Sequence, residues 1–272
     1  MFGECRESYV PTICESLGIP YTGSGVETLT TCLNKAHTND ILSANNLPVP
    51  PFQVFYSPDD QLELDLSFPL IIKLLHEGSS MGLSRKSVVD NIKALRDRVD
   101  VMIDTYHEPA LVQQFIMGRE FTVGILGNQN PYVLPITEIT FQDPYRIVTF
   151  NFDDEVVPVI KCLRGEDFWL EFYKNIIPHK SECPAKISAE LTERIQQTSI
   201  RAFRTLGCLD WCRIDLRLGN DNQLYILELN PIAGIAPGYW LPNAAQVANL
   251  DYTAFINGIL NIARERIYDD HF

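Results

Sequence analysis

The most constraining stretch of the sequence is a pair of apolar runs near its C-terminal end, residues 212–218 and 224–230. A polar turn, Gly219-Asn220-Asp221-Asn222, separates them. Apolar and polar residues alternate in both runs with a period of two, which is typical of β-strands that bury one face. Two such strands joined by a short polar turn predict a β-hairpin.

Polar side chains interrupt this predicted hairpin at regular positions. Arg213 and Asp215 have the same parity in the first strand, and Glu228 and Asn230 share a parity in the second, so each pair lies on one strand face. If the strands pair, Asp215, Glu228 and Asn230 can converge, and two carboxylates with an amide oxygen suit Mg²⁺. Arg213 beside them can hold a phosphate oxygen. An ordinary solvated strand face is the alternative, but the apolar run at 225–227 favours buried, paired charges.

Composition narrows the class of protein. The chain has 272 residues, of which 46% are hydrophobic and 21% charged, as expected of a packed globular protein. A net charge of −13 argues against a non-specific grip on nucleic acid or on an anionic membrane. The seven cysteines form no CxxC pair, and no run of eighteen apolar residues occurs. We therefore expect a cytoplasmic protein with reduced thiols and with neither nucleic acid nor membrane as a partner.

Helices are predicted where apolar residues recur between capping residues and glycines. One ends at Leu17 before Gly18, one is capped by Ser188 and ends before Gly207, and the others cover residues 35–44, 88–99 and 254–266. Short apolar runs at 68–73, 110–116 and 121–126 predict further strands.

A loop rich in glycine and serine follows the first of these strands. It reads His76-Glu77-Gly78-Ser79-Ser80-Met81-Gly82-Leu83-Ser84. Backbone N–H groups in such a loop can close over phosphates. The Gly-Lys-Ser/Thr ending of a Walker loop is absent, and a generic linker is the alternative.

The order of these motifs carries a resemblance to a known family. Arg213-x-Asp215 followed by Glu228-Leu229-Asn230-Pro231-x-x-Gly234 resembles the metal-binding signature of the ATP-grasp ligases, and more narrowly that of the D-alanine–D-alanine ligase group. The segment at 17–25, LGIPYTGSG, and the loop at 77–82 are similar to motifs of the same group. The resemblance implies an α+β (α/β) ATP-grasp fold, in which two subdomains grip ATP, with a truncated or reduced N-terminal domain. The implied domains are a remnant of the N-terminal domain at 1–33, a central subdomain at 34–117, and a C-terminal subdomain with the metal site at 118–272.

The resemblance also implies a role for each candidate residue. The residues implied to bind ATP are Lys35, Lys73, Ser79, Ser80, Met81, Gln113, Gln114, Phe115, Ile116 and Glu120. Asp215, Glu228 and Asn230 are the implied ligands of Mg²⁺ or Mn²⁺, and Arg213, Ser79 and Glu77 the implied catalytic residues. Glu4, Gly234 and Tyr239 are the implied substrate contacts.

Two positions depart from the family's pattern. Gln113 stands where the family carries a glutamate near the adenine amine, although an amide can also accept from that amine. Tyr239 stands where the family has a serine that binds the carboxylate of the second amino acid. The pocket for that substrate is therefore expected to differ from the family's.

The resemblance implies an ATP-dependent ligase that joins a carboxylate to an amine of amino-acid-like substrates through an acyl phosphate. We expect an acceptor other than D-alanine, as in specialised-metabolism members such as the mycosporine-like amino acid ligases. A homodimer is one expected assembly. The alternative is an ATP-binding module, or degenerate paralogue, without ligase activity. The changes at Gln113 and Tyr239 and the missing N-terminal strands motivate that alternative.

Overall fold

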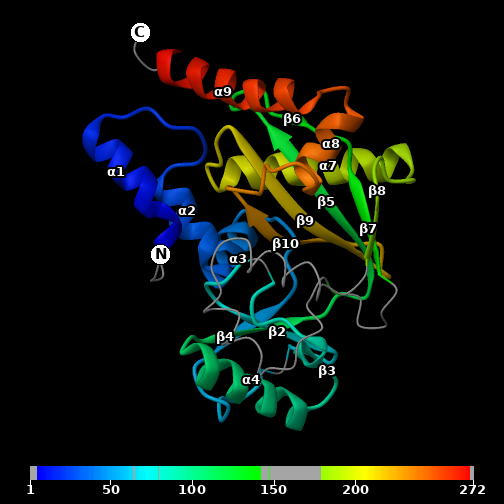
Figure 1. Cartoon of the computed structure of the whole chain (residues 1–272). Helices are drawn as coiled ribbons and strands as arrows, with labels where there is room; N and C mark the ends of the chain where they lie inside the picture. The colour runs from blue at the N-terminus through cyan, green and yellow to red at the C-terminus, as the bar shows by residue number, and fades with distance from the viewer. Residues whose placement is uncertain (1–4, 64, 79, 142–146, 148–178, 270–272) are drawn as a thin grey trace. The chain divides into compact units, whose positions relative to one another are not determined.

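The computed structural model describes residues 5–63, 65–78, 80–141, 147 and 179–269. The chain divides into two compact units, each described by itself (Figure 1). Unit 1 comprises Met1–Val49, Met117–Ile139 and Ser181–Phe272, and unit 2 comprises Pro50–Ile116 and Thr140–Lys180. Among the described residues, no helix is both long and apolar enough to span a membrane.

The larger sheet contains the predicted hairpin. Its strands run in the order β10-β9-β5-β7-β8, and β6 pairs with β5. Their bounds are β5 Gly118–Leu126, β6 Tyr132–Val133, β7 Thr137–Phe141, β8 His179–Glu182, β9 Trp211–Gly219 and β10 Leu224–Asn230. Strand β9 pairs with both β5 and β10 in antiparallel register, which confirms the hairpin.

Two helices cover one face of this sheet, α3 (Lys35–Ala44) and α7 (Ala189–Thr205). Leu42 of α3 and Phe203 of α7 pack with the inward side chains of β9, such as Ile214. Ser188 caps α7 as predicted, because its side chain accepts a hydrogen bond from the amide of Leu191. This packing accords with the place of α3 in unit 1.

The opposite face is covered at one end by α8 (Trp240–Val247) and α9 (Tyr252–Asp269). Leu241 of α8 and Phe255 of α9 pack there with Leu134. The helix approaches the sheet closely at Gly124, because a Cβ atom at that position would lie 2.5 Å from a methyl carbon of Leu241. The polar residues of β5, β9 and β10 lie on this same face.

The N-terminal segment of unit 1 is helical. A short 3-10 helix, η1 (Arg6–Ser8), leads into α1 (Tyr9–Leu17), and α2 (Val26–Leu33) follows. As predicted, α1 ends at Gly18, which has a positive φ of 64° and donates its amide to the last carbonyl groups of the helix.

Unit 2 contains a four-stranded sheet in the order β1-β4-β2-β3. The strands are β1 Phe52–Phe55, β2 Leu70–Leu74, β3 Val88–Val89 and β4 Ala110–Gln114, with η2 Arg85–Ser87 before β3. Helix α4 (Ile92–Tyr106) runs along one face (Figure 1), where Leu95 and Val99 pack against Ile72 and Val112.

The helix predicted at 88–99 was wrong at its start. Val88 and Val89 pair with β2 instead, as suits two β-branched residues. The helix begins at Ile92, where the side chain of Asn91 accepts a hydrogen bond from the amide of Ala94.

Candidate functional site

A β-bulge directs the carboxylate of Glu228 to the polar face of the larger sheet. Ile226 is buried in the core and pairs with Leu216, whereas Glu228 pairs with Asp215, so Leu227 is an inserted residue. If this stretch paired as a regular strand with no bulge, residues 226 and 228 would lie on the same face and Glu228 would point into the core. With it, Glu228 and Asn230 lie on the face that Arg213 and Asp215 occupy, and the four side chains come together as the sequence predicted.

The polar residues form rows across three strands. Thr122, Asp215 and Glu228 are directly opposite one another on β5, β9 and β10. Gly124, Arg213 and Asn230 form the next row. Directly opposite side chains have Cβ atoms about 4.5–5.5 Å apart, so the two carboxylates are close neighbours.

Asp215 lies at the centre of this arrangement and accepts hydrogen bonds from three side chains. Thr122 Oγ1 donates to Oδ1 over 2.7 Å, and Asn230 Nδ2 donates to Oδ2 over 3.2 Å. The guanidinium of Arg213 donates from Nε to Oδ1 over 3.0 Å and from a terminal nitrogen to Oδ2 over 2.9 Å. This fixed geometry holds the carboxylate in one orientation.

Arg213 is held on two sides. Its guanidinium carbon lies 5.2 Å from the centre of the Trp240 ring, a distance typical of a cation–π interaction. Burial acts to lower the pKa of Arg213, but its attraction to Asp215 and Glu228 and its hydrogen bonds to Asp215 outweigh burial and raise the pKa. The site therefore contains a permanent cation, the guanidinium of Arg213. Trp240, which packs against it, was not among the predicted site residues.

A second cation, Lys35, lies beside Glu228. Its ammonium nitrogen is 3.6 Å from Glu228 Oε1, and 11% of its side chain is exposed. Lys35 is the first residue of α3, where a positive charge opposes the helix dipole. The contact with Glu228 offsets that penalty.

Glu120 occupies the third row of the same face, opposite Arg217. Glu120 Oε2 accepts hydrogen bonds from Nε of Arg217 over 2.8 Å and forms a salt bridge with its terminal nitrogen at 2.7 Å. Both side chains are nearly buried, at 11% and 3% exposure. Arg217 was not among the predicted site residues, although its spacing of two from Asp215 placed it on the same face.

The donor set fits a hard divalent cation. Among the described residues, no group of three or more His, Cys, Asp or Glu side chains is placed to hold a metal. The oxygen donors available are therefore the carboxylates of Asp215 and Glu228 and the amide of Asn230. Mg²⁺ is commonly bound by one or two carboxylates, with phosphate oxygens and water completing its shell, so this set suits Mg²⁺ bound together with a nucleotide.

The predicted substrate contacts lie after β10. Tyr239 precedes α8 as its N-cap residue, and its ring packs against Gly234, where a Cβ atom would lie 2.6 Å from a ring carbon. Any larger residue at 234 would displace this ring. Glu4 lies outside the described residues.

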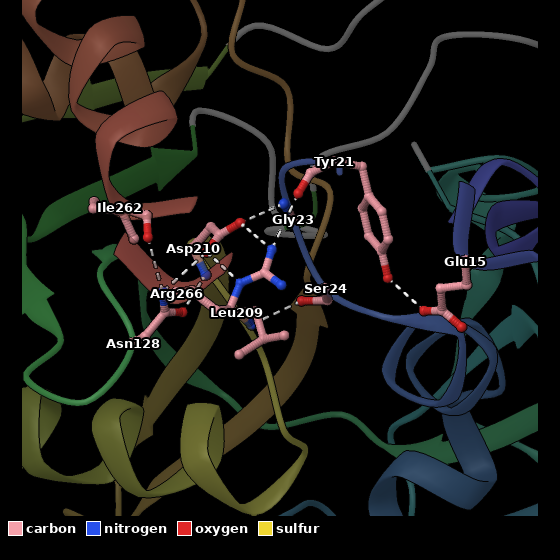
Figure 2. A network of polar contacts seen from close by, with 9 residues as sticks. All are labelled: Glu15, Tyr21, Gly23, Ser24, Asn128, Leu209, Asp210, Ile262 and Arg266. Atoms are coloured by element: carbon pink, nitrogen blue, oxygen red, sulfur yellow. Dashed lines mark hydrogen bonds and ion pairs between the residues drawn. The ribbon is translucent and has the colours of Figure 1, made fainter. Parts of the chain in front are cut away.

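A polar network anchors the start of β9 (Figure 2). The carboxylate of Asp210 is fully buried and forms a salt bridge at 3.0 Å with Arg266 of α9. It also accepts from the amide of Gly23 over 2.7 Å and from Asn128 Nδ2 over 3.0 Å. Asp210 has a positive φ of 64°, a strained conformation that surrounding contacts must maintain. Three segments distant in sequence thus fix the strand that carries Arg213.

The remaining candidates belong to unit 2. Lys73 of β2 donates to Gln113 Oε1 of β4 over 3.1 Å. The side chain of Gln114 instead accepts from the amide of Ser67 and donates to the carbonyl of Pro69, at 3.1 and 3.2 Å. Phe115 and Ile116 follow directly, and Phe115 packs in a small apolar cluster with Ile71.

The glycine- and serine-rich loop is a series of tight turns. The amide of Met81 donates to the carbonyl of Gly78, and that of Leu83 donates to the carbonyl of Ser80, both over 3.0 Å. Ser80 has a positive φ of 57°. The side chain of Met81 packs against the core beneath α4. Glu77 lies at the start of the loop, and Ser79 lies outside the described residues.

Comparisons with known proteins match most of the chain. A family model described as the D-ala D-ala ligase C-terminus matches residues 41–261. The uncharacterized protein y4sG of Sinorhizobium fredii is 31% identical over 266 residues, which cover 98% of this chain and 73% of that protein. The D-alanine–D-alanine ligase of Desulforudis audaxviator is 29% identical over 265 residues, covering 96% of this chain and 78% of the ligase.

Solved structures agree at the level of the fold. The crystal structure of D-alanine–D-alanine ligase from Bacillus anthracis complexed with ATP has a TM-score of 0.73 and 21% identity, covering 98% of this chain and 77% of that one. A second crystal structure of the ligase from this organism has a TM-score of 0.74 and 22% identity, covering 100% and 80%. The predicted ATP-grasp fold is confirmed, and the chain belongs to the D-alanine–D-alanine ligase family.

Proposed function

We propose that this protein is an ATP-dependent ligase that joins the carboxylate of one amino-acid-like substrate to the amine of another. The observation that carries the proposal is the direct register of Asp215 with Glu228, with Arg213 and Asn230 in the adjoining row. This arrangement combines oxygen ligands for a divalent cation with a fixed guanidinium, as transfer of a phosphoryl group requires.

The chemistry follows from the weakness of a carboxylate as an electrophile. Its oxygen cannot leave, so the γ-phosphoryl group of ATP is first transferred to it, which gives an acyl phosphate and ADP. The amine then attacks the acyl carbon, phosphate leaves, and the amine loses a proton. Held by Asp215, Glu228 and Asn230, Mg²⁺ or Mn²⁺ would neutralise charge on the phosphate oxygens.

The chain's own residues would perform the remaining tasks. The guanidinium of Arg213 would balance the negative charge of the transferred phosphoryl group and of the tetrahedral oxyanion. Lys35 and Lys73 would contact the phosphates of ATP. Ser79 and the rest of the loop that begins at Glu77 would exclude water, which otherwise hydrolyses an acyl phosphate.

We further propose an acceptor other than D-alanine. The support is the ring of Tyr239, which packs on Gly234 at the position where the family's motif has a small serine. A larger side chain there changes the shape available to the second substrate. A ligase of specialised metabolism, such as one acting on a mycosporine-like core, is the finer form of this proposal.

The test is release of ADP from Mg²⁺-ATP with D- and L-amino acids, singly and in pairs. We expect ADP release that depends on the amino acids, is lost in Glu228→Gln, and is retained in Glu193→Gln, an exposed residue of α7. Activity retained in full by Glu228→Gln would refute the metal assignment. ATP binding without ADP release, for any pair tested, would favour the ATP-binding module.

A further inference from the structure

A buried hydrogen-bond donor in unit 2 lacks a partner. Gln113 of β4 is 1% exposed, and its Nε2 is a buried atom with no hydrogen-bond partner in the described part of the chain. Leaving such a donor unsatisfied costs about 1–3 kcal/mol. Native proteins rarely retain an unsatisfied group of this kind without a reason, and an absent ligand is one such reason.

The orientation of this amide is fixed by its neighbour. Gln113 Oε1 lies 3.1 Å from the ammonium nitrogen of Lys73. An ammonium group has only donors, so the amide oxygen must face Lys73 and the NH₂ group must point away from it. Gln113 therefore presents a donor, not an acceptor, to whatever lies beyond it.

The surroundings of Gln113 suit a flat aromatic ring. Phe52 of β1 and Ile71 of β2 are directly opposite Gln113 on its two sides, and directly opposite residues share one face of a sheet. Phe115 extends the same face and packs with Ile71. A hydrogen-bond donor that lies among apolar and aromatic side chains can pair with the edge of a heterocyclic base while those side chains contact its ring.

We propose that Gln113 is a specificity-determining residue that donates to the purine base of the nucleotide, and that the chain accepts a 6-oxopurine triphosphate at least as well as ATP. The proposal rests on the function proposed above, since it concerns the nucleotide of the same reaction. The keto oxygen at C6 of hypoxanthine or guanine accepts a hydrogen bond, whereas the amine at C6 of adenine is itself a donor. With the Gln113 oxygen held by Lys73, the NH₂ group pairs with the keto oxygen.

The experiment compares the binding of ATP, inosine triphosphate and guanosine triphosphate to the full chain by calorimetry. ATP and inosine triphosphate differ only at C6 and N1, so their affinity ratio isolates the contact with Gln113. We expect inosine triphosphate to bind at least as tightly as ATP. Gln113→Glu presents an acceptor and should shift the ratio toward ATP by about tenfold or more.

Two further variants keep the result interpretable. Gln113→Met removes the donor without adding charge and should abolish any preference for the keto base. Gln53→Glu introduces the same charge change on β1, where the Gln53 side chain bonds to Gln61 and Glu63, and should leave the ratio unchanged.

The outcomes separate this inference from the proposed function. If ATP binds more than tenfold tighter than inosine triphosphate and Gln113→Glu does not change the ratio, the inference is wrong and the ligase proposal stands. If the folded chain binds none of the three nucleotides, both are overturned.

Discussion

Asp210→Asn tests whether the buried network of Figure 2 stabilises the fold. Oδ2 of Asp210 accepts from the amide of Gly23 and from Arg266, and Oδ1 accepts from Asn128 Nδ2 and from Arg266 Nε. In asparagine one of these two oxygens becomes an NH₂ group, so whichever way the amide turns, two donors lose their acceptor.

The expected cost follows from these contacts. Each buried donor left without an acceptor costs about 1–3 kcal/mol, and removing one partner of a buried ion pair costs about 3–5 kcal/mol. Because Asp210 is 0% and Arg266 19% exposed, the free energy of unfolding should fall by about 3–5 kcal/mol. The midpoint of unfolding in urea should fall by at least about 1 M. Tryptophan fluorescence can monitor this unfolding, because Trp211 is adjacent to Asp210 in sequence.

The matched control is Asp59→Asn, which removes the same charge from a side chain that is 91% exposed and pairs with Arg96. Exposed pairs contribute about 0–1 kcal/mol, so this variant should unfold close to the wild type. If Asp210→Asn were no less stable than this control, the argument that the network anchors β9 would be refuted.

Three further predictions concern the site and its surroundings. Deleting Leu227 removes the bulge but leaves Glu228 directly after buried Ile226, on the polar face and still in register with Asp215; unit 1 should therefore stay folded, as measured by circular dichroism, and loss of folding would contradict this account of the register. A double-mutant cycle that combines Trp240→Ala with a substitution of Arg213 should give a coupling of about 0.5–2 kcal/mol in the free energy of unfolding. Burial and a hydrogen bond to a carboxylate raise the pKa of Tyr21 to about 12, so stability should fall as pH rises from about 10 to 12. Subtracting the absorbance titration of Tyr21→Phe from that of the wild type isolates the Tyr21 phenol. A titration of that phenol near pH 10 would contradict the prediction.

The sequence predicts the hairpin well because a period of two reports directly on the two faces of a strand. It places Arg213 with Asp215, and Glu228 with Asn230, and the structure brings these pairs together. The bulge at Leu227 could not be predicted in this way. The buried residues of β10 change parity, from Leu224 and Ile226 to Leu229, but Tyr225 and Leu227 are apolar too, so the sequence pattern alone does not locate the extra residue.

Contacts between strands that are distant in sequence were the second feature that could not be predicted. Thr122 donates to Asp215, and Glu120 pairs with Arg217, because β5 lies beside β9 although about ninety residues separate them in sequence. The residues spaced by two on each strand mark one polar face, but nothing local indicates which strand is the neighbour. The prediction for the start of α4 failed for a local reason. The helix begins after Asn91, its N-cap residue, whereas Val88 and Val89 before it belong to a strand.

Four residues described above depart from local rules. Lys35 begins a helix against its dipole, Asp210 adopts a positive φ, Leu227 interrupts a regular ladder, and Gln113 buries an unsatisfied donor. Each lowers stability when considered alone. For three of them the structure shows a compensating interaction. Glu228 forms a salt bridge with Lys35, and Arg266 forms one with Asp210. The bulge at Leu227 places Glu228 opposite Asp215. Gln113 alone has no compensating partner for its NH₂ group among the described residues, and for that reason we assign its partner to a bound nucleotide.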